Sequence, residues 1–495
     1  MRSTDARALS GEDIPHGHGL LVRSCEDCAC PTPRRHTGSR SRARVAGETP
    51  LVRADGVLDL PLDDEHHVLF SPHGRGGVVV VNRAAHEVFR AFDTATSPAD
   101  LVRRGGDPRR TAEVVARLVE QDLVHERGAA PTPEFAESRE LTAWLHVTNE
   151  CNLRCTYCYV HKSPESMDAA TGRQTVDALV GSALRHGFRA LRLKYAGGEA
   201  SLNPDVLFDL HDYAAARCAE HGLELSAVLL SNGVAIPDRL AARLLERDVN
   251  LMISLDALGE AHDAQRPTRA GKPSARRVVR TVDRLVGLGL KPHLSITVTG
   301  RTTGDVAAVV RFALERDLTF SFNFFRDNDC AAGAADLRYE ERALVSGLVG
   351  AFAVIEEMLP PWSVLGSVLD RGQLLEPRRT SCGVGDNYVV VDQRGQIAKC
   401  HMDIGSTLGD VRATDPVAAI RDDTAGVLNL LVEDKEGCRD CTWRNWCSGG
   451  CALATFRATG RFDVRSPNCN IYRAVYPAAL RLEGLRVLRF AEQPA

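Results

Sequence analysis

The sequence predicts an α/β protein built on a parallel β-sheet that is covered by helices. Between residue 142 and about residue 359, apolar runs with strand character alternate with amphipathic helical patterns. The predicted strands are 142–148, 189–195, 225–231, 249–255, 292–298 and 318–325, with helices such as 168–186 and 305–316 between them. Parallel barrels carry their chemistry at the carboxyl ends of the strands. Functional residues are therefore expected just after each predicted strand.

Length and composition limit the class of protein. A chain of 495 residues predicts two or three domains, and 44% hydrophobic with 25% charged residues is typical of a soluble globular protein. With 61 basic and 65 acidic residues, the net charge of −4 does not favour nucleic acid as a partner. The longest aliphatic run, 78–81, is too short to span a membrane, and residues 1–20 lack the apolar stretch of a signal peptide. A cytoplasmic location is expected, in which fifteen cysteines favour metal or redox chemistry over disulfides.

Three cysteines follow the first predicted strand with the spacing C-x3-C-x2-C, namely Cys151, Cys155 and Cys158. Thiolates ligate iron–sulfur clusters, and a tight loop can hold three irons of a four-iron cubane. The fourth iron would then stay open for a substrate or cosubstrate. The alternatives are three unrelated buried thiols, or a zinc site without a fourth cysteine, for which His146 and His161 are the only close substitutes.

This loop, with Tyr157 before its last cysteine, resembles the signature of the radical S-adenosylmethionine (SAM) superfamily. The resemblance implies a [4Fe-4S] cluster whose open iron binds the amino and carboxylate groups of SAM. Reduction would cleave SAM to methionine and a 5′-deoxyadenosyl radical, which abstracts a hydrogen atom from the substrate. It also implies that the six strand–helix units, residues 142–359, form a partial (β/α)6 TIM barrel. The cofactor would supply the chemistry, and the protein its placement and shielding.

The resemblance extends to the ends of the next strands. Gly197-Gly198-Glu199 matches the family motif that binds the amino group of SAM, although Ala200 stands where the family usually has proline. Glycines let the backbone approach a ligand closely. The resemblance implies further cofactor contacts from Tyr157, Ser231, Ser254, Asp256 and Arg266. For Arg266, the arginine expected to reach the SAM carboxylate, the alternative is a solvated surface charge.

Later strands contribute weaker candidates. Thr297 and Val298 are candidate neighbours of the adenine or ribose, and Asn323, Arg326 and Asp327 are candidate substrate contacts or members of surface salt bridges. Cys218 is expected in a helix core. Cys330, in the loop after the last strand, is expected to be a loop thiol that lies near the site or apart from it.

The region before the barrel divides into three parts. Residues 1–50 form an expected disordered, arginine-rich tail, in which Cys25, Cys28 and Cys30 are adventitious thiols or metal ligands. In residues 51–128, strands at 57–62, 68–70 and 77–81 precede three short helices: 83–92, one opening at Ser97-Pro98, and 111–123. This order resembles a PqqD-like winged-helix domain, which implies that a leader peptide adds as a strand to the sheet edge. A structural cap or a DNA-binding winged helix are the alternatives, and residues 129–141 are a linker.

Seven cysteines follow the barrel in the pattern C-x12-G-x4-C…C-x2-C-x5-C-x3-C…C: Cys382, Cys400, Cys438, Cys441, Cys447, Cys451 and Cys469. The pattern resembles the SPASM extension of radical SAM enzymes and assigns it to residues 360–480, followed by a tail, 481–495. The resemblance implies two auxiliary [4Fe-4S] clusters. The distal cluster would use Cys438, Cys441, Cys447 and Cys469, and the proximal one Cys382, Cys400 and Cys451. A pair of structural zinc sites is the alternative, but seven ligands do not make two closed four-ligand sites.

Two departures from this pattern affect the expected chemistry. Residues 385–388 lack the extra cysteine that completes the proximal cluster in some relatives, so an open iron, Asp386 or another side chain is expected there. Sulfatase maturases have aspartate directly after the second SPASM cysteine, whereas this chain has His401, with Asp403 two residues on. His401 or Asp403 is therefore a candidate catalytic base.

Together these features predict a radical SAM/SPASM enzyme that modifies a ribosomally made precursor peptide. The expected product is a carbon–carbon, carbon–oxygen or thioether cross-link, and the expected electron donor is a flavodoxin or ferredoxin. Much of this rests on analogy with the family. The alternatives are a maturase of a folded protein, of the sulfatase or quinohemoprotein type, and a zinc-stabilised binding protein without catalysis.

Overall fold

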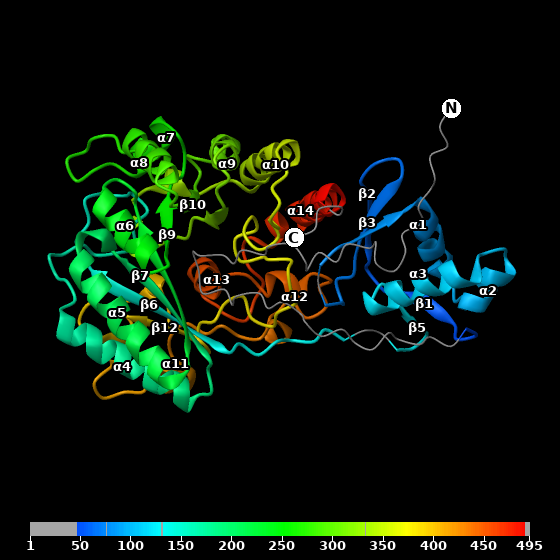
Figure 1. Ribbon diagram of the computed structural model, residues 1–495, viewed down its shortest axis with the longest axis horizontal. Helices are drawn as coiled ribbons and strands as arrows, with labels where there is room; N and C mark the ends of the chain where they lie inside the picture. Colours follow the sequence, from blue (N-terminus) through cyan, green and yellow to red (C-terminus); the bar gives the residue numbers. More distant parts are fainter. Residues whose placement is uncertain (1–46, 76, 130–131, 332, 491–495) are drawn as a thin grey trace.

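The computed structural model describes residues 47–75, 77–129, 132–331 and 333–490. The three N-terminal cysteines and most of the predicted arginine-rich tail lie outside these residues. Figure 1 places the barrel at one end of the molecule, a small domain at the other, and helices α12, α13 and α14 between them. Among the described residues, no helix has the length and apolar character needed to cross a membrane.

The small domain joins an antiparallel sheet to three helices. The sheet has the order β2-β3-β4, with strands Leu58–Pro61, His66–Phe70 and Val79–Asn82. The helices are α1 (Arg83–Arg90), α2 (Pro98–Arg103) and α3 (Pro108–Glu120). The predicted order of three strands followed by three helices is confirmed. A second pair of strands, β1 (Leu51–Arg53) and β5 (Val124–Glu126), was not predicted, because each has only three residues.

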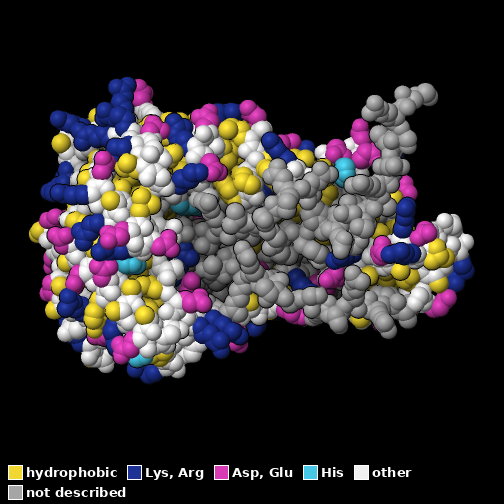
Figure 2. All heavy atoms as spheres, viewed as in Figure 1, with side chains coloured by type: hydrophobic (Ala, Val, Ile, Leu, Met, Phe, Trp, Pro, Cys, Tyr) yellow, Lys and Arg dark blue, Asp and Glu magenta, His cyan; other side chains and the backbone are white. Residues whose placement is uncertain are grey.

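The barrel contains the six predicted parallel strands, each within two residues of its predicted bounds. They are β6 (Glu140–Thr148), β7 (Ala190–Gly197), β8 (Glu224–Ser231), β9 (Val249–Ser254), β10 (His293–Val298) and β11 (Phe320–Phe324). The helices that alternate with them are α4 (Ala169–Arg185), α5 (Pro204–His221), α6 (Asp238–Glu246), α7 (Glu260–Gln265), α8 (Ala275–Gly287), α9 (Val306–Leu314) and α10 (Glu341–Glu357). The predicted α/β class is therefore confirmed. On the face shown in Figure 2, the described acidic and basic side chains are interspersed, in keeping with the small net charge.

The C-terminal region extends the barrel sheet. Strand β12 (Tyr388–Val391) pairs in parallel with β6, and β13 (Gln396–Ala398) and β14 (Thr407–Asp410) continue the sheet in antiparallel fashion. The remaining helices are α11 (Pro416–Asp422), α12 (Arg444–Cys447), α13 (Ala452–Thr459) and α14 (Cys469–Phe490). Because β12 is hydrogen-bonded to β6, the nearby cysteines Cys382 and Cys400 are fixed relative to the barrel.

The prediction of a C-terminal tail from residue 481 is wrong. Helix α14 continues to Phe490, and its Leu482 and Val487 are buried in the main core. Two of its charged side chains, Arg486 and Glu483, form a buried ion pair. At Gly484 the helix lies so close to the small domain that a Cβ atom would come within 2.8 Å of Val68. Arginine and glutamate within this helix gave the sequence a polar appearance that tertiary packing overrides.

Candidate active site

The three cysteines of the C-x3-C-x2-C loop follow β6 at its carboxyl end. Backbone hydrogen bonds fasten the loop to the end of α7 and the segment after it: Arg154 N–H donates to the Pro267 carbonyl at 2.8 Å, and Thr156 N–H to that of Gln265 at 2.9 Å. Burial raises the pKa of the Cys151 thiol and raises that of Cys155 to about 12, and neighbouring thiols add to both shifts. Cys151 is buried and Cys155 and Cys158 are partly buried, and a thiol removed from water needs a nearby cation to become a thiolate. Three thiols on one rigid loop, with Lys162 and Arg266 nearby, fit the ligand set of an iron–sulfur cluster.

A cavity of about 220 Å³ opens beside this loop at the carboxyl ends of the barrel strands. The structure brings seven of the eight predicted cofactor contacts to its wall: Tyr157, Gly197, Gly198, Glu199, Ser231, Ser254 and Arg266. Thr297, Asn323 and Arg326, predicted with less support, line it too. These residues come from six different strands or the loops after them, as a barrel site requires.

The Gly-Gly-Glu segment is joined directly to the cysteine loop. Gly198 N–H donates to the Thr148 carbonyl, and Glu199 N–H to the Glu150 carbonyl, both at 2.7 Å. A Cβ atom at Gly198 would overlap the Glu150 carbonyl oxygen and lie 2.7 Å from that of Asn149. Glycine is therefore required here because two backbones approach each other closely.

The Glu199 carboxylate is 2% exposed and forms part of the cavity wall. Burial raises its pKa, while hydrogen bonds from the Ser231 hydroxyl (2.8 Å) and the Asn232 N–H (2.7 Å) act in the opposite direction. A positively charged group in the cavity would complete the stabilisation of the carboxylate.

Asp256 is the one predicted cofactor contact that the structure does not bring to the cavity wall. It is fully buried and accepts hydrogen bonds from Tyr157 Oη at 2.8 Å, Gln265 Nε2 at 2.7 Å and Thr297 N–H at 3.0 Å. It also pairs with Arg266 at 3.7 Å, and Arg266 donates to the Tyr157 hydroxyl. Asp256 therefore positions Tyr157 and Arg266, whose side chains do line the cavity.

Three of the C-terminal cysteines, Cys382, Cys400 and Cys451, line one small pocket that adjoins the cavity. Arg326 and Arg371 line both spaces. Burial would raise the pKa of Cys451, but the two guanidinium groups lower it below the ordinary value. Sequence reasoning missed Arg371, which lies in an irregular segment without a motif.

The structure does not bring Asp386 to this three-cysteine pocket. Its carboxylate is 63% exposed and accepts a hydrogen bond from Arg421 at 2.7 Å. The predicted alternative in which Asp386 completes the proximal ligand set is therefore wrong for this conformation.

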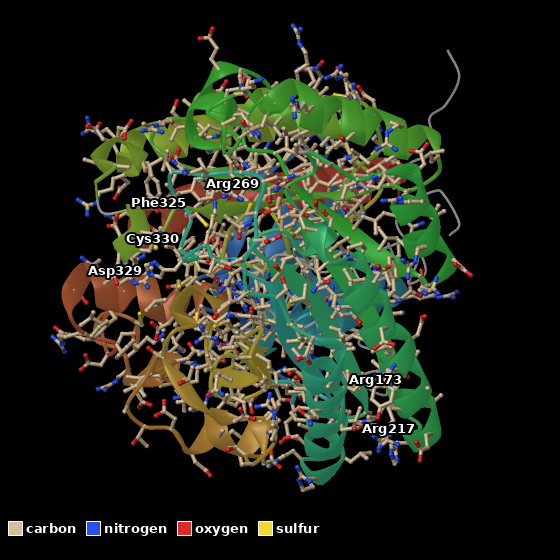
Figure 3. All side chains as sticks on the ribbon, turned by 90° about the vertical axis from the view of Figure 1, so that its left-hand side faces the viewer. Arg173, Arg217, Arg269, Phe325, Asp329 and Cys330 are labelled. Atoms are coloured by element: carbon tan, nitrogen blue, oxygen red, sulfur yellow. The ribbon has the colours of Figure 1, made fainter. Side chains whose placement is uncertain are left out.

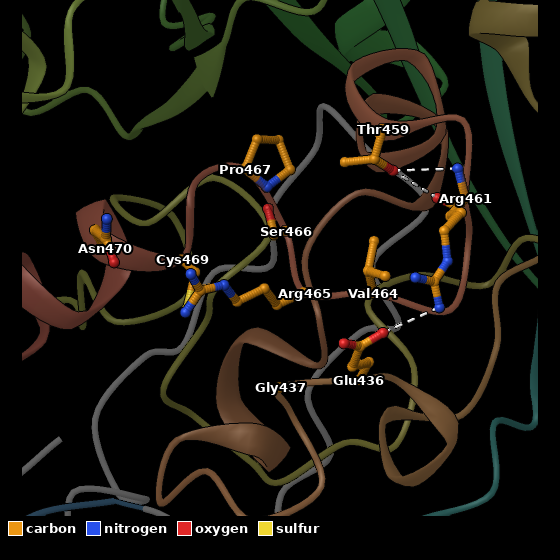
Figure 4. A pocket seen from close by; sticks show the side chains of 10 residues that line it. All are labelled: Glu436, Gly437, Thr459, Arg461, Val464, Arg465, Ser466, Pro467, Cys469 and Asn470. Carbon is orange, nitrogen blue, oxygen red and sulfur yellow. Dashed lines mark hydrogen bonds and ion pairs between the residues drawn. The ribbon is translucent and has the colours of Figure 1, made fainter.

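The other four C-terminal cysteines form a second group. Burial raises the pKa of Cys447 to about 12 and that of Cys438 to about 11, and the thiols of Cys441 and Cys469 contribute to both shifts. Arg473 donates to Cys441 Sγ at 3.1 Å. Cys469 also borders an open pocket of about 680 Å³, in which Arg465 lies beside it (Figure 4).

This second group is packed against the small domain. The fully buried Trp446, next to Cys447, donates from its indole N–H to the Pro72 carbonyl at 3.0 Å. Phe70, at the end of β3, meets the Trp446 ring edge to face with centroids 4.8 Å apart. The small domain thus forms part of the wall around the distal cysteines.

Replacement of Phe70 by alanine is expected to lower iron incorporation at the distal cysteines. Loss of a buried aromatic ring costs about 3–5 kcal/mol, and here the cavity would open beside Trp446. Iron counting after reconstitution measures the effect, with Phe135→Ala, a partly exposed phenylalanine in the linker, as the control. Equal iron content in both variants would contradict this coupling.

The two candidate bases lie in different places. His401 is nearly buried, stacks on Trp144 with ring centroids 4.4 Å apart, and shares a 2.9 Å hydrogen bond between its Nδ1 and the Tyr388 hydroxyl. It borders both the cavity and the three-cysteine pocket. Burial lowers its pKa well below the usual value, so the imidazole is neutral.

Asp403 lines a separate pocket of about 290 Å³ with His161, Asp329 and Cys330. Figure 3 shows Asp329 and Cys330 side by side in the segment after β11, near the edge of the molecule in that view. Cys330 Sγ lies 3.7 Å from His161 Nε2, and Cys330 is exposed. The structure therefore brings only His401 to the site.

Comparison with known proteins supports this description. Residues 145–313 match the model of the Radical SAM superfamily. Uncharacterized protein MJ0907 of Methanocaldococcus jannaschii is 31% identical over 171 residues, which are 34% of this chain and 57% of the relative. The cysteine-type anaerobic sulfatase-maturating enzyme of Clostridium perfringens is 22% identical over 324 residues, 61% of this chain and 85% of that enzyme. The chain thus spans a little over half the length of the first of these relatives.

Among solved structures, native anSMEcpe with bound AdoMet and Cp18Cys peptide is similar with a TM-score of 0.59 and 19% identity, over 71% of this chain and 99% of that one. At this identity the similarity concerns the fold. Fold, site and family match together define residues 145–313 as a radical SAM domain, the domain of a class of enzymes. This domain contains the cysteine loop and most of the cavity wall.

Proposed function

We propose that this protein is a radical SAM enzyme that modifies a ribosomally synthesised precursor peptide. The observation that carries the proposal is the shared cavity. The C-x3-C-x2-C loop, Glu199 and Arg266 meet there, and the same space continues past Arg326 and Arg371 to a pocket of three further thiols. A cofactor held by Glu199 and Arg266 would therefore lie next to the three-thiol pocket.

The residues present fit SAM and its cluster. Cys151, Cys155 and Cys158 would hold a [4Fe-4S] cluster, Glu199 would bind the ammonium of SAM and Arg266 its carboxylate. Arg266 Nε is buried without a hydrogen-bond partner among the described residues, which leaves it available to such a ligand. When bound and reduced, the cluster supplies the electron that cleaves SAM to methionine and the 5′-deoxyadenosyl radical, which removes a substrate hydrogen.

The rest of the cavity wall positions and shields the reactants. Leu230, Met252, Phe324 and Phe325 line it with apolar surface, which excludes water from reactive species. Ser231 and Ser254 offer hydroxyl groups for the polar parts of SAM. Asp256, behind the wall, holds Tyr157 and Arg266 in place.

The seven C-terminal cysteines are proposed to hold two auxiliary [4Fe-4S] clusters. The grouping of the thiols supports the predicted division into Cys382, Cys400 and Cys451, and Cys438, Cys441, Cys447 and Cys469. The three-thiol group borders the cavity, so its cluster would bind the substrate or accept the electron left after bond formation. A cytoplasmic flavodoxin or ferredoxin would be the electron donor.

A peptide substrate is supported by the similarity to a peptide-bound structure and by an open strand edge in the small domain. The similar anSMEcpe structure contains a peptide, and the Clostridium perfringens relative is named as a sulfatase-maturating enzyme. The strand β2 has a partner on one edge only among the described residues, so an extended leader can add to the other edge. The product would be a carbon–carbon, carbon–oxygen or thioether cross-link in the core peptide.

A peptide assay tests this function against its competitor, maturation of a folded protein. The purified, reconstituted enzyme would be incubated with SAM, a reductant and short precursor peptides encoded beside its gene. A mass loss of two hydrogens from one peptide, dependent on its leader, is expected. SAM cleavage without modification of any such peptide, together with modification of a folded sulfatase, would contradict the peptide assignment.

Replacement of His401 by asparagine is expected to separate SAM cleavage from product formation. If the neutral imidazole removes the final proton, product formation falls by about 10²-fold or more while 5′-deoxyadenosine is still released. Asp403→Asn is the matched comparison, because Asp403 lies in a different pocket and its replacement is expected to change neither rate. Equal effects of both substitutions would contradict a basic role for His401.

A further inference from the structure

A further cluster of metal-ligating side chains lies in the small domain and contains no cysteine. Asp59 in β2, His67 in β3 and His86 in α1 place one ligand atom each within 4.8 Å of the other two. His67 Nδ1 lies 2.8 Å from Asp59 Oδ1, and His86 Nε2 lies 2.8 Å from Asp59 Oδ2. The two imidazole rings are stacked with centroids 3.7 Å apart.

The fold explains why these side chains converge. Asp59 pairs with Leu69 across the β2–β3 ladder, and His67 points to the same side of the sheet as Leu69 because side chains alternate along a strand. That side is covered by the small domain's helices, and His86 lies one helical turn before the buried Phe89. Three separate elements therefore direct polar groups to one point between the sheet and α1.

The chemistry of this point suits a cation. The side chains of Asp59, His86 and His67 are 12%, 16% and 28% exposed, so the carboxylate is mostly removed from water. Burial alone would raise the pKa of Asp59, but the hydrogen bonds from His86 and His67 lower it, so the group is ionised. Two imidazoles and one carboxylate are a donor set that binds zinc and similar divalent metals.

We propose that Asp59, His67 and His86 form a binding site for a divalent metal ion of the zinc class. The ion would replace the hydrogen bonds that now link the two imidazoles to the carboxylate, with each neutral ring carrying its proton on the other nitrogen. Three protein ligands leave at least one coordination position for water or for a ligand atom of a partner. Bound metal would fasten α1 to the edge strand β2. The inference is independent of the proposed function.

One nearby cation has to be accommodated. Arg90 Nη1 lies 3.9 Å from Asp59 Oδ2, but its side chain is 56% exposed and also pairs with Asp93 at 3.1 Å. The guanidinium can therefore move towards Asp93 when the metal binds. His66, next to His67, interacts instead with Asp63 at 3.0 Å and is no part of the cluster.

Zinc retention by the full-length protein tests the site. The cysteine groups are first loaded with iron and sulfide so that they cannot take up zinc, and the protein is then incubated with zinc and passed through a desalting column. The variants are His67→Gln and His86→Gln, in which an amide N–H can still donate to Asp59. His66→Gln is the matched control. Zinc per chain and the melting temperature with and without zinc are measured.

The wild type and His66→Gln are expected to retain one zinc ion per chain more than His67→Gln and His86→Gln. Zinc is expected to raise the melting temperature of the wild type and of His66→Gln by several degrees. The melting temperatures measured with a chelator show whether the variants are folded. If the wild type retains no zinc, or if all four proteins retain the same amount, the cluster is a hydrogen-bonded pair of histidines and the proposal is overturned.

Discussion

Replacement of Gly198 by alanine is expected to abolish SAM cleavage. The added Cβ would overlap the Glu150 carbonyl oxygen and lie 2.7 Å from the Asn149 carbonyl, and neither backbone atom can yield without moving the cysteine loop. The same shift would break the hydrogen bond from Glu199 N–H to the Glu150 carbonyl. A displacement of about 1 Å at a reacting centre can cost 10²-fold or more in rate, and here cluster and SAM contacts move together.

The measurement is 5′-deoxyadenosine release under a strong reductant, with iron content determined on the same sample. Gly181→Ala is the matched control, because this glycine lies in α4, where an added Cβ meets only the side chain of Arg185 at 3.6 Å. The control is expected to retain full activity. Normal cleavage by the Gly198 variant would show that the close backbone approach does not matter for the site.

Replacement of Arg266 by methionine is expected to weaken SAM binding strongly and also to lower the folding stability of the protein. It removes the proposed SAM carboxylate partner and leaves the fully buried Asp256 carboxylate without its cation. Breaking a buried ion pair by removing one partner costs about 3–5 kcal/mol. The Michaelis constant for SAM would rise by about 10²-fold, as expected for loss of a charge-assisted contact.

Denaturant unfolding and SAM-dependent kinetics measure the two effects of Arg266→Met. Arg173→Met serves as the control, because the Arg173–Asp209 pair is on the surface, with Arg173 53% exposed. Surface pairs contribute about 0–1 kcal/mol, so this variant is expected to resemble the wild type. An unchanged Michaelis constant for the Arg266 variant would contradict the carboxylate contact.

The parts of the fold with strong periodicity could be predicted from the sequence. Most residues of the six barrel strands are buried or partly buried, and the cysteine loop and Gly-Gly-Glu segment follow the first two strands, so local pattern alone located the cavity. Tyr157, Glu199 and Arg266 lie far apart in sequence, yet the carboxyl ends of parallel strands bring them together.

The remaining features depend on tertiary contacts that leave no local signal. Asp256 lies two residues after the end of β9, but its carboxylate accepts hydrogen bonds from Tyr157 and Gln265 and does not line the cavity. Arg371 comes from a segment without regular structure, and α14 buries the Glu483–Arg486 ion pair. The pairing of Asp59 with two histidines likewise appears only when β2, β3 and α1 are assembled.

The central claim is that the loop of Cys151, Cys155 and Cys158 holds a cluster that cleaves SAM. Its most direct test is anaerobic reconstitution of the wild type and of the variant with all three cysteines replaced by alanine, followed by iron counting and a SAM cleavage assay. Cys218→Ala, a buried thiol in α5 outside every cysteine group, is the control. The account predicts about twelve irons for the wild type and the control and about eight for the variant, with 5′-deoxyadenosine released only by the first two. Equal iron content in all three proteins, or no cleavage by the fully loaded wild type, would contradict it.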